Sequence, residues 1–262
     1  ILCCISSIFC KTKVIVCERS NPARYSLKYK ILRRIAYKRA NGFVFQTNNA
    51  RNYFKKYKIK KYKIIGNPID IQNMPDIFTG EREKVVVYFG RIVKEKNLEL
   101  LIDEFSEVYN KHNEYKLEII GDGKYKEQIE RYKNSKEYRN HIILAPATKD
   151  IFNVIRKSMI FVLPSFVEGY PNCLIEAMAL GIPSISTNCP IGGPAEIIEH
   201  GINGILIKNN SYNELSNFMI EIIENKDLRL RLSLNAYKIR NKLDAETISN
   251  EWKSFIDDIM DR

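Results

Sequence analysis

Short apolar runs, typical of buried strands, alternate along most of the chain with segments whose apolar positions recur at helical spacing. From residue 84 onward the pattern predicts strands at 85–89, 116–120, 141–144, 160–163, 183–186 and 204–207. It predicts helices at 98–109, 125–134, 150–157, around 173–180 and near 194–199, with three more closing the chain. Strands that alternate with helices through short loops predict an α/β lobe, in which helices cover both faces of a doubly wound parallel sheet.

The first 70 residues show a similar pattern on a smaller scale. Strands are predicted at 13–17, 42–46 and 62–65, and helices at 25–39 and 48–57. Within the helix at 25–39, Leu27, Ile31 and Ile35 form an apolar stripe, while basic residues fall elsewhere on the helix. Residues 66–83 combine two prolines, two glycines and polar residues, which indicates a domain boundary.

The positive charge of the chain is concentrated in one segment. The formal net charge is +11, and between Arg19 and Ile69 there are fifteen Lys or Arg and no Asp or Glu. This predicts a basic surface at residues 19–69 that faces phosphate-bearing partners or an anionic membrane, with the helix at 25–39 as the contact. A solvated basic face without a partner is the alternative. Tyrosines among the cations would suit a nucleic-acid binder, but no RNA-binding motif is present, so we expect no nucleic acid.

The cysteines and histidines show no pattern of metal ligands. None of the six cysteines forms a C-x-x-C pair, and the three histidines have no ligand spacing with them, so we expect no metal and no other cofactor. Scattered cysteines fit a reducing compartment. No apolar run is long enough to cross a bilayer. These features favour a cytoplasmic protein attached peripherally to the membrane.

Candidate chemistry follows the predicted strands after residue 84, because open parallel sheets bind their ligands at strand ends. Gly90 and Arg91 follow the strand at 85–89, with Lys96 five residues after Arg91. A glycine allows close backbone approach, and two cations on one loop suit a diphosphate. A loop with solvated charges explains them equally well. The turn at Gly121, Asp122 and Gly123 is a weaker signal, because such residues are common in turns.

Two carboxylates stand out in the segment at 164–187. Glu168 lies in a loop after a wholly apolar strand, and Glu176 lies inside an apolar helix, eight residues later. Asn172 is placed to cap that helix, whose first N–H groups could receive phosphate oxygens. A carboxylate in so apolar a stretch is costly unless it is paired or bound to a ligand hydroxyl. An ordinary loop acid and a structurally satisfied Glu176 remain the alternatives for each residue taken singly.

These motifs resemble the family-4 glycosyltransferases, the group 1 retaining enzymes with the two-lobed GT-B fold. The matching pieces are GR-x4-KN at 90–97, IIGDG at 119–123, PS-x2-EGYPN-x3-EAMA-x-G-x-P at 164–183, GGPAEII at 192–198 and G-x-N-G at 201–204. ERSNP at 18–22 and GNPID at 66–70 are similar to signatures of the subgroup that builds surface polysaccharides and lipid-linked oligosaccharides. The resemblance implies that residues 1–70 end an N-terminal acceptor lobe, 71–83 link the lobes, 84–240 bind the donor and 241–262 form a helix returning to the first lobe.

The resemblance also implies roles for individual residues in transfer, with retention, from a nucleotide sugar such as a UDP-sugar to a glycan or lipid-linked acceptor. Arg91 and Lys96 would hold the diphosphate, Glu168 would contact the donor sugar, and Glu176 would bind the ribose. The remaining donor-site residues would be Gly90, Gly121, Asp122, Gly123, Ser165, Gly169, Tyr170, Pro171 and Asn172, and those on the acceptor side Glu18 and Arg19. The family needs no metal.

Two departures from the family pattern affect these expectations. Ala195 stands where close relatives carry Arg, which removes one polar contact near the donor loop. The glycine-rich loop and the catalytic His of the acceptor lobe do not occur in this sequence. We therefore expect an incomplete active site, and the alternative function is a nucleotide-sugar-binding fragment without transfer. A UDP-sugar epimerase would share the fold class but would not explain the segment at 164–183.

Overall fold

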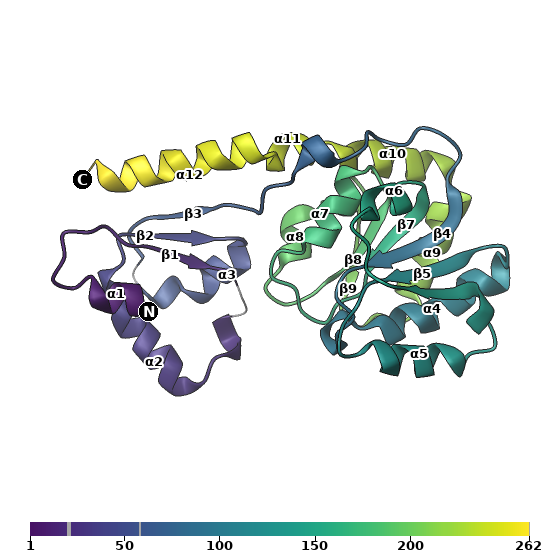
Figure 1. The fold of residues 1–262 in the computed structure, drawn as a ribbon, viewed down its shortest axis with the longest axis horizontal. Helices are drawn as coiled ribbons and strands as arrows, with labels where there is room; N and C mark the ends of the chain where they lie inside the picture. Colours follow the sequence, from purple (N-terminus) through teal and green to yellow (C-terminus); the bar gives the residue numbers. More distant parts are fainter. Residues whose placement is uncertain (20–21, 58, 262) are drawn as a thin grey trace.

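The computed structural model describes residues 1–19, 22–57 and 59–261, which form two α/β lobes (Figure 1). The small lobe contains a parallel sheet of three strands in the order β1-β2-β3. Its strands are β1 (Ile15–Glu18), β2 (Gly42–Phe45) and β3 (Tyr62–Ile64), and its helices are α1 (Leu2–Ser6), α2 (Leu27–Ala36) and α3 (Asn48–Tyr53). Single 3-10 turns lie at η1 (Pro22–Arg24), η2 (Tyr37–Arg39) and η3 (Lys55–Tyr57).

The large lobe is built on a parallel sheet of six strands in the order β6-β5-β4-β7-β8-β9. Counted along the chain, this is the order 3-2-1-4-5-6 of doubly wound dinucleotide-binding folds. The strands are β4 (Glu83–Phe89), β5 (Lys116–Ile120), β6 (Ile142–Ala145), β7 (Ser158–Leu163), β8 (Ser184–Asn188) and β9 (Ile205–Lys208). The helices are α4 (Leu98–Lys111), α5 (Lys126–Asn134), α6 (Ile151–Ile155), α7 (Asn172–Ala179), α8 (Gly193–Ile197), α9 (Glu214–Glu224) and α10 (Lys226–Tyr237).

Burial explains why the strands of the large lobe were predictable. Every residue of β7 is buried, as expected for a central strand of a parallel sheet covered on both faces. The α/β class with parallel sheets is thus confirmed, and the element boundaries differ from the predicted ones by one or two residues at most positions. Among the described residues, four helices rather than three follow β9, because the short α11 (Arg240–Leu243) interrupts the closing segment.

The last helix returns to the small lobe. The 16-residue α12 (Ala245–Met260) runs from the large lobe across the top of the small one in Figure 1. Its Phe255 and Ile259 pack on Gly42 at the start of β2, where a Cβ would meet Ile259 at 2.8 Å. Lys61 forms an ion pair with Asp258 at 2.6 Å. The two lobes are therefore joined both by the chain before β4 and by α12.

The structure shows which face of the helix at 25–39 packs inward. The apolar stripe of α2 lies in solvent, with Leu27 exposed to 73%, Ile31 to 54% and Ile35 to 62%. The buried residues of α2 are Arg33 and Ala36. Arg33 is 1% exposed and lies against the rings of Tyr25, Tyr53, Phe54 and Tyr57. Helical periodicity identified the residues that share a face but not the face that packs inward.

No helix among the described residues is long and apolar enough to cross a membrane.

Candidate active site

The candidate site lies where the order of the large sheet reverses. β4 and β7 are neighbours in the sheet, but the chain leaves them toward opposite edges. The loops that follow these two strands carry Gly90 to Lys96 and Pro164 to Pro171. Ligands of doubly wound folds bind in the crevice outside the strand ends at such a switch point. The topology thus brings together two of the three segments that the sequence singled out.

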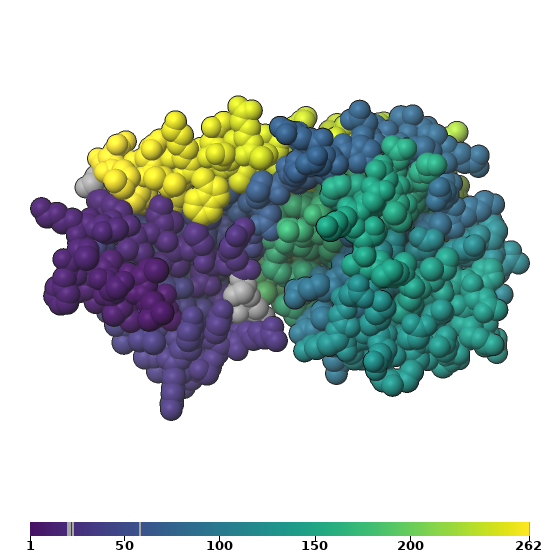
Figure 2. All heavy atoms as spheres, viewed as in Figure 1, coloured from purple at the N-terminus to yellow at the C-terminus, as the bar shows by residue number. Residues whose placement is uncertain are grey.

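A cleft between the lobes lies outside these strand ends, and Figure 2 shows the indentation between the lobes. The cleft consists of two adjoining cavities: one of about 620 Å³ beside α7, which we call the inner cavity, and one of about 540 Å³, which we call the outer cavity. Both cavities are lined by Arg19 of the small lobe and by Arg91, Lys96, Glu168 and Gly169 of the large lobe, so the cleft is continuous. The inner cavity is also lined by Gly90, Tyr170, Pro171, Asn172 and Glu176.

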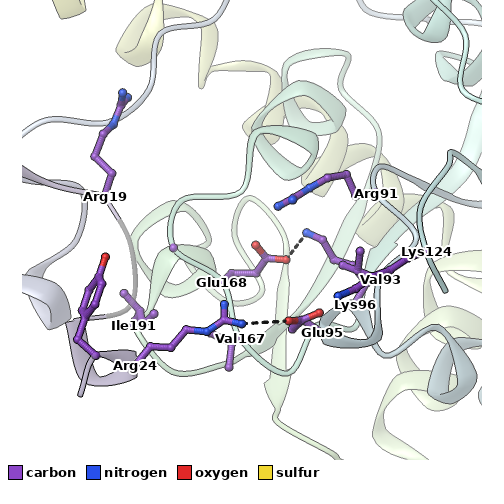
Figure 3. A pocket seen from close by; sticks show the side chains of 12 residues that line it. Arg19, Arg24, Arg91, Val93, Glu95, Lys96, Lys124, Val167, Glu168 and Ile191 are labelled. Atoms are coloured by element: carbon purple, nitrogen blue, oxygen red, sulfur yellow. Dashed lines mark hydrogen bonds and ion pairs between the residues drawn. The ribbon is translucent and has the colours of Figure 1, made fainter. Parts of the chain in front are cut away.

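Lys96 and Glu168 form an ion pair at the centre of the cleft (Figure 3). Lys96 Nζ lies 2.5 Å from Glu168 Oε1, which also accepts a hydrogen bond of 2.6 Å from Ser165 Oγ. Ser165 is fully buried, so it supports Glu168 from below. Burial disfavours the lysine ammonium, but electrostatic interactions with Cys173 and Glu168, together with the Glu168 hydrogen bond, raise the pKa of Lys96 above its ordinary value.

Arg91 offers a second cation beside this pair. Its side chain points toward Glu168 and Lys96 in Figure 3. Tyr88 Oη donates a hydrogen bond of 2.8 Å to the Arg91 carbonyl, which fixes the backbone of the loop. Within the described residues, no acid lies within ion-pair distance of Arg91, so its charge is available to a ligand.

Glu176 faces the inner cavity. It lies on α7, and none of the described residues donates a hydrogen bond to its carboxylate. Burial removes water from this carboxyl and raises its pKa. A half-buried acceptor without a donor is suited to hydroxyl groups of a ligand.

The backbone between Glu168 and α7 is packed closely against two other segments. A Cβ on Gly193 would come within 1.9 Å of the Gly169 carbonyl, and one on Gly169 within 3.2 Å of the Arg19 carbonyl. Only glycine at position 193 permits this approach. Asn172 does not cap α7 as predicted: Pro171 is the N-cap, and the Asn172 side chain bonds to Asn67 instead.

Two residues of the inner wall, Gln46 and Asn67, had no predicted role. Asn67 Oδ1 accepts hydrogen bonds from Arg19 Nη2 and Gln46 Nε2, each at 2.5 Å. Asn67 Nδ2 donates to Asn172 Oδ1 at 2.7 Å, across the junction of the lobes. Asn67 belongs to the GNPID segment, which the sequence analysis singled out, but that motif did not predict the hydrogen bonds of Asn67.

The turn at Gly121, Asp122 and Gly123 does not line either cavity. A Cβ on Gly121 would meet the Gly90 carbonyl at 1.9 Å, and one on Gly123 the Ile92 carbonyl at 2.1 Å. Asp122 forms an ion pair with Lys126 at 2.6 Å. The turn therefore supports the loop of Arg91 from behind.

Glu18, predicted on the acceptor side, is buried and also lies outside the cavity lining. Its Oε1 accepts a hydrogen bond of 2.5 Å from Tyr37 Oη and lies 3.8 Å from Arg33 Nη1. Burial raises the pKa of the Glu18 carboxyl, against the opposing effects of Tyr37 and Arg33. Arg33 also donates a hydrogen bond to the Pro22 carbonyl, so this cluster holds Pro22, two residues before Arg24.

Contacts on both sides of the cleft join the lobes. Arg24 reaches from the small lobe to within 3.7 Å of Glu95 (Figure 3). On the opposite side Glu196 accepts hydrogen bonds from the Asn48 backbone and side chain, at 2.9 and 2.8 Å. Thr47 Oγ1 donates to the Ile191 carbonyl at 2.7 Å. Ala195, the departure from the family pattern, is exposed beside Glu196.

Comparisons with known proteins agree with a two-lobed α/β protein. Residues 71–239 match the family described as Glycosyl transferases group 1. An uncharacterized glycosyltransferase of Methanocaldococcus jannaschii is 31% identical over 94% of this chain and 72% of its own length. An α-1,4-N-acetyl-D-galactosaminyltransferase of Campylobacter jejuni, which acts on a diphosphoundecaprenol-linked saccharide, is 24% identical over 99% of this chain and 72% of its own.

The fold is also that of solved glycosyltransferases. The structure of Anabaena Alr3699/HepE in complex with UDP has a TM-score of 0.87 at 20% identity and covers 98% of this chain and 75% of that one. The chain belongs to the glycosyl transferases group 1 and has the GT-B fold. It spans between 43% and 72% of the length of three curated relatives that it matches.

Proposed function

We propose that the cleft binds a nucleotide-sugar donor, a UDP-sugar, and that the protein transfers its sugar with retention to a glycan or lipid-linked acceptor. The observation that carries the donor site is the arrangement along its inner wall. A carboxylate without a partner among the described residues, Glu176, lies on the same wall as the cations Arg91 and Lys96. A nucleoside diphosphate offers hydroxyl donors and a diphosphate anion to these two kinds of group.

The proposed roles follow from this arrangement. Glu176 accepts hydrogen bonds from the ribose hydroxyls, and Arg91 and Lys96 balance the diphosphate charge that grows as the nucleotide leaves. These cations supply the charge balance that a metal provides in other transferases, so we expect no metal requirement. Glu168, the partner of Lys96, lies next to the diphosphate and contacts the sugar, while the backbone of Gly169 to Asn172 holds sugar and phosphate oxygens.

The acceptor is proposed to be a surface glycan or its lipid-linked precursor. The Campylobacter relative acts on a lipid-linked saccharide, which supports this class of acceptor. Arg19 faces the cleft from the small lobe and would meet the acceptor there. For a lipid-linked acceptor, the basic segment at 19–69 would attach the protein to the cytoplasmic face of an anionic membrane.

Calorimetric titration of this chain with UDP and with UDP-glucose tests the donor site. Arg91→Ala should weaken UDP binding by about 1.5–3 kcal/mol, the range for a hydrogen bond to a charged group. Lys149→Ala, which removes an exposed cation outside both cavities, is the matched control and should leave the affinity unchanged. Unchanged UDP affinity in both Arg91→Ala and Glu176→Gln would overturn the proposed donor site.

A further inference from the structure

The carboxamide of Asn67 connects three side chains from different regions of the cleft. Arg19 and Gln46 follow the ends of β1 and β2 in the small lobe, and Asn172 is the first residue of α7 in the large lobe. Asn67 itself follows β3 in the segment that leaves the small lobe. Its Oδ1 accepts from Arg19 and Gln46, and its Nδ2 donates to Asn172 Oδ1.

The direction of these hydrogen bonds is fixed by Arg19. A guanidinium group has only donors, so the Asn67 atom that faces it must be the oxygen. The nitrogen of Asn67 then faces Asn172, and the Asn172 atom that receives it must again be the oxygen. The Asn172 Nδ2 is therefore left to face away from Asn67, and no described residue accepts a hydrogen bond from it.

Asn172 stands one helical turn before Glu176 on α7, so the two side chains share a face of the helix. Both line the inner cavity. This face thus combines a carboxylate acceptor with an amide donor. Were the Asn172 carboxamide turned over, the wall would present two acceptors and no donor at this place, which would suit a different ligand.

We propose that Asn67 is a positioning residue that holds Asn172 with its Nδ2 toward the donor ligand, where it donates a hydrogen bond to an oxygen of the nucleotide sugar. Arg19 of the small lobe thereby determines whether Asn172 of the large lobe presents a hydrogen-bond donor or an acceptor to the ligand. The inference rests on the proposed function, since the ligand is the same nucleotide sugar. It assigns Asn67 an indirect action, exerted only through Asn172.

A double-mutant cycle measured by calorimetry with UDP-glucose tests this indirect action. Asn67→Ala and Asn172→Ala should each lower the affinity about threefold to tenfold, as the loss of one hydrogen bond does. In the Asn172→Ala background, Asn67→Ala should cause almost no further loss. Asn73→Ala is the matched control, because Asn73 bonds to Asp70 and lines neither cavity.

Losses that multiply in the double variant would overturn the proposal, because Asn67 would then touch the ligand itself or act on the fold. Thermal unfolding of each variant checks that it is folded, and Asn67→Ser replaces Asn67→Ala if the latter is not. Nitrogen-15 spectra of the ligand-free protein give a second measurement. Asn67→Ala should move the side-chain amide resonances of Asn172, and unmoved resonances would also overturn the proposal. Wild-type protein that binds no UDP-glucose would overturn the proposed function, and the spectra would still decide whether Asn67 orients Asn172.

Discussion

The ammonium of Lys96 lies 2.5 Å from the carboxylate of Glu168, and both side chains are largely buried at the centre of the cleft. Each therefore neutralises the other before any ligand arrives. A diphosphate that approached Lys96 would compete with Glu168 for the same cation. The pair thus links the proposed diphosphate contact to the carboxylate proposed to contact the sugar.

Replacing the two members of this pair should affect different properties of the protein. Lys96→Met leaves a buried carboxylate without its cation, so the free energy of unfolding should fall by about 3 kcal/mol. Glu168→Gln keeps an acceptor for Ser165 and releases Lys96, so UDP affinity should be unchanged or higher. Urea unfolding and calorimetry measure the two effects, with Lys94→Met as the exposed control. Equal loss of UDP affinity in Glu168→Gln and Lys96→Met would refute the separate roles.

Glu176 predicts a conflict between stability and binding. The pKa of Glu176 is raised in the folded protein, so the folded state is destabilised when this carboxyl ionises. The loss of stability develops as pH rises above the ordinary pKa of a glutamate, and it is absent at lower pH. Glu176→Gln should therefore stabilise the protein at pH 7 but not at pH 4. The same variant should bind UDP about tenfold or more weakly, since it loses a charged acceptor.

Thermal unfolding at the two pH values and UDP titration measure these effects, and Glu127→Gln on the exposed face of α5 is the control. In the wild type, UDP affinity should also decline as pH falls through the raised pKa of Glu176. A Glu176→Gln variant that is no more stable than the wild type at pH 7 would mean that the carboxylate has a partner in solution.

Arg33 and Arg34 are adjacent in sequence, but their predicted effects differ. Arg33 is buried among four aromatic rings and lies 3.8 Å from Glu18, whereas Arg34 is exposed. Arg33→Gln removes the cation beside a buried carboxylate and should destabilise the protein by about 3–5 kcal/mol. Arg34→Gln should change stability by less than about 0.5 kcal/mol. Equal midpoints of thermal unfolding for the two variants would contradict the burial of Arg33.

Glu196 is predicted to hold the lobes together on one side of the cleft. Glu196→Ala removes both acceptors of Asn48 and leaves its backbone N–H without a protein partner. Hydrogen bonds to a carboxylate contribute about 1.5–3 kcal/mol, so the variant should raise the fraction of molecules in which the cleft is open. Small-angle scattering should record a larger radius of gyration for Glu196→Ala than for Glu199→Ala, an exposed acid nearby. The same radius of gyration for both variants would show that the other contacts between the lobes are enough to keep the cleft closed.

The sequence predicted the large lobe far better than the small one, for a physical reason. Wholly apolar strands such as β7 can only be buried, so their pattern has one solution. The apolar stripe of α2 could face either the core or the solvent. Arg33 becomes the inward residue only because aromatic side chains from α3 and the residues that follow it surround its guanidinium group. No spacing in the sequence signals that distant cage.

In the candidate site, too, some residues were predictable from the sequence and others were not. The charged residues Arg91, Lys96, Glu168 and Glu176 were predictable because charges and carboxylates in apolar surroundings demand a partner or a ligand. A neutral amide in the sequence gives no comparable indication that it needs a partner or a ligand. The role of Asn67 depends on hydrogen bonds to residues 48, 21 and 105 positions away, which only the folded chain brings together.

The exposed face of α2 predicts attachment to anionic membranes. Leu27, Ile31 and Ile35 form its apolar stripe, and Lys28, Arg34 and Lys38 on or just beyond the helix are exposed cations. Each cation near an anionic surface contributes about 1 kcal/mol, so the three together should give reversible, salt-sensitive binding. Arg33 and Arg39 do not belong to this group, because Arg33 is buried and Arg39 donates hydrogen bonds to carbonyls of residues 7, 10 and 12.

Co-sedimentation with phosphatidylglycerol vesicles should therefore exceed that with phosphatidylcholine vesicles, and should decline as salt is added, because the attraction is screened within a Debye length. Replacing Lys28, Arg34 and Lys38 by Gln should remove most of the binding, while Ile31→Ser and Ile35→Ser should weaken it at every salt concentration through the lost apolar contact. UDP affinity should not change in any of these variants, since none of the residues lines the cleft. Binding that is indifferent to lipid charge would exclude the electrostatic contribution, and binding that survives the triple replacement would place the contact elsewhere on the small lobe.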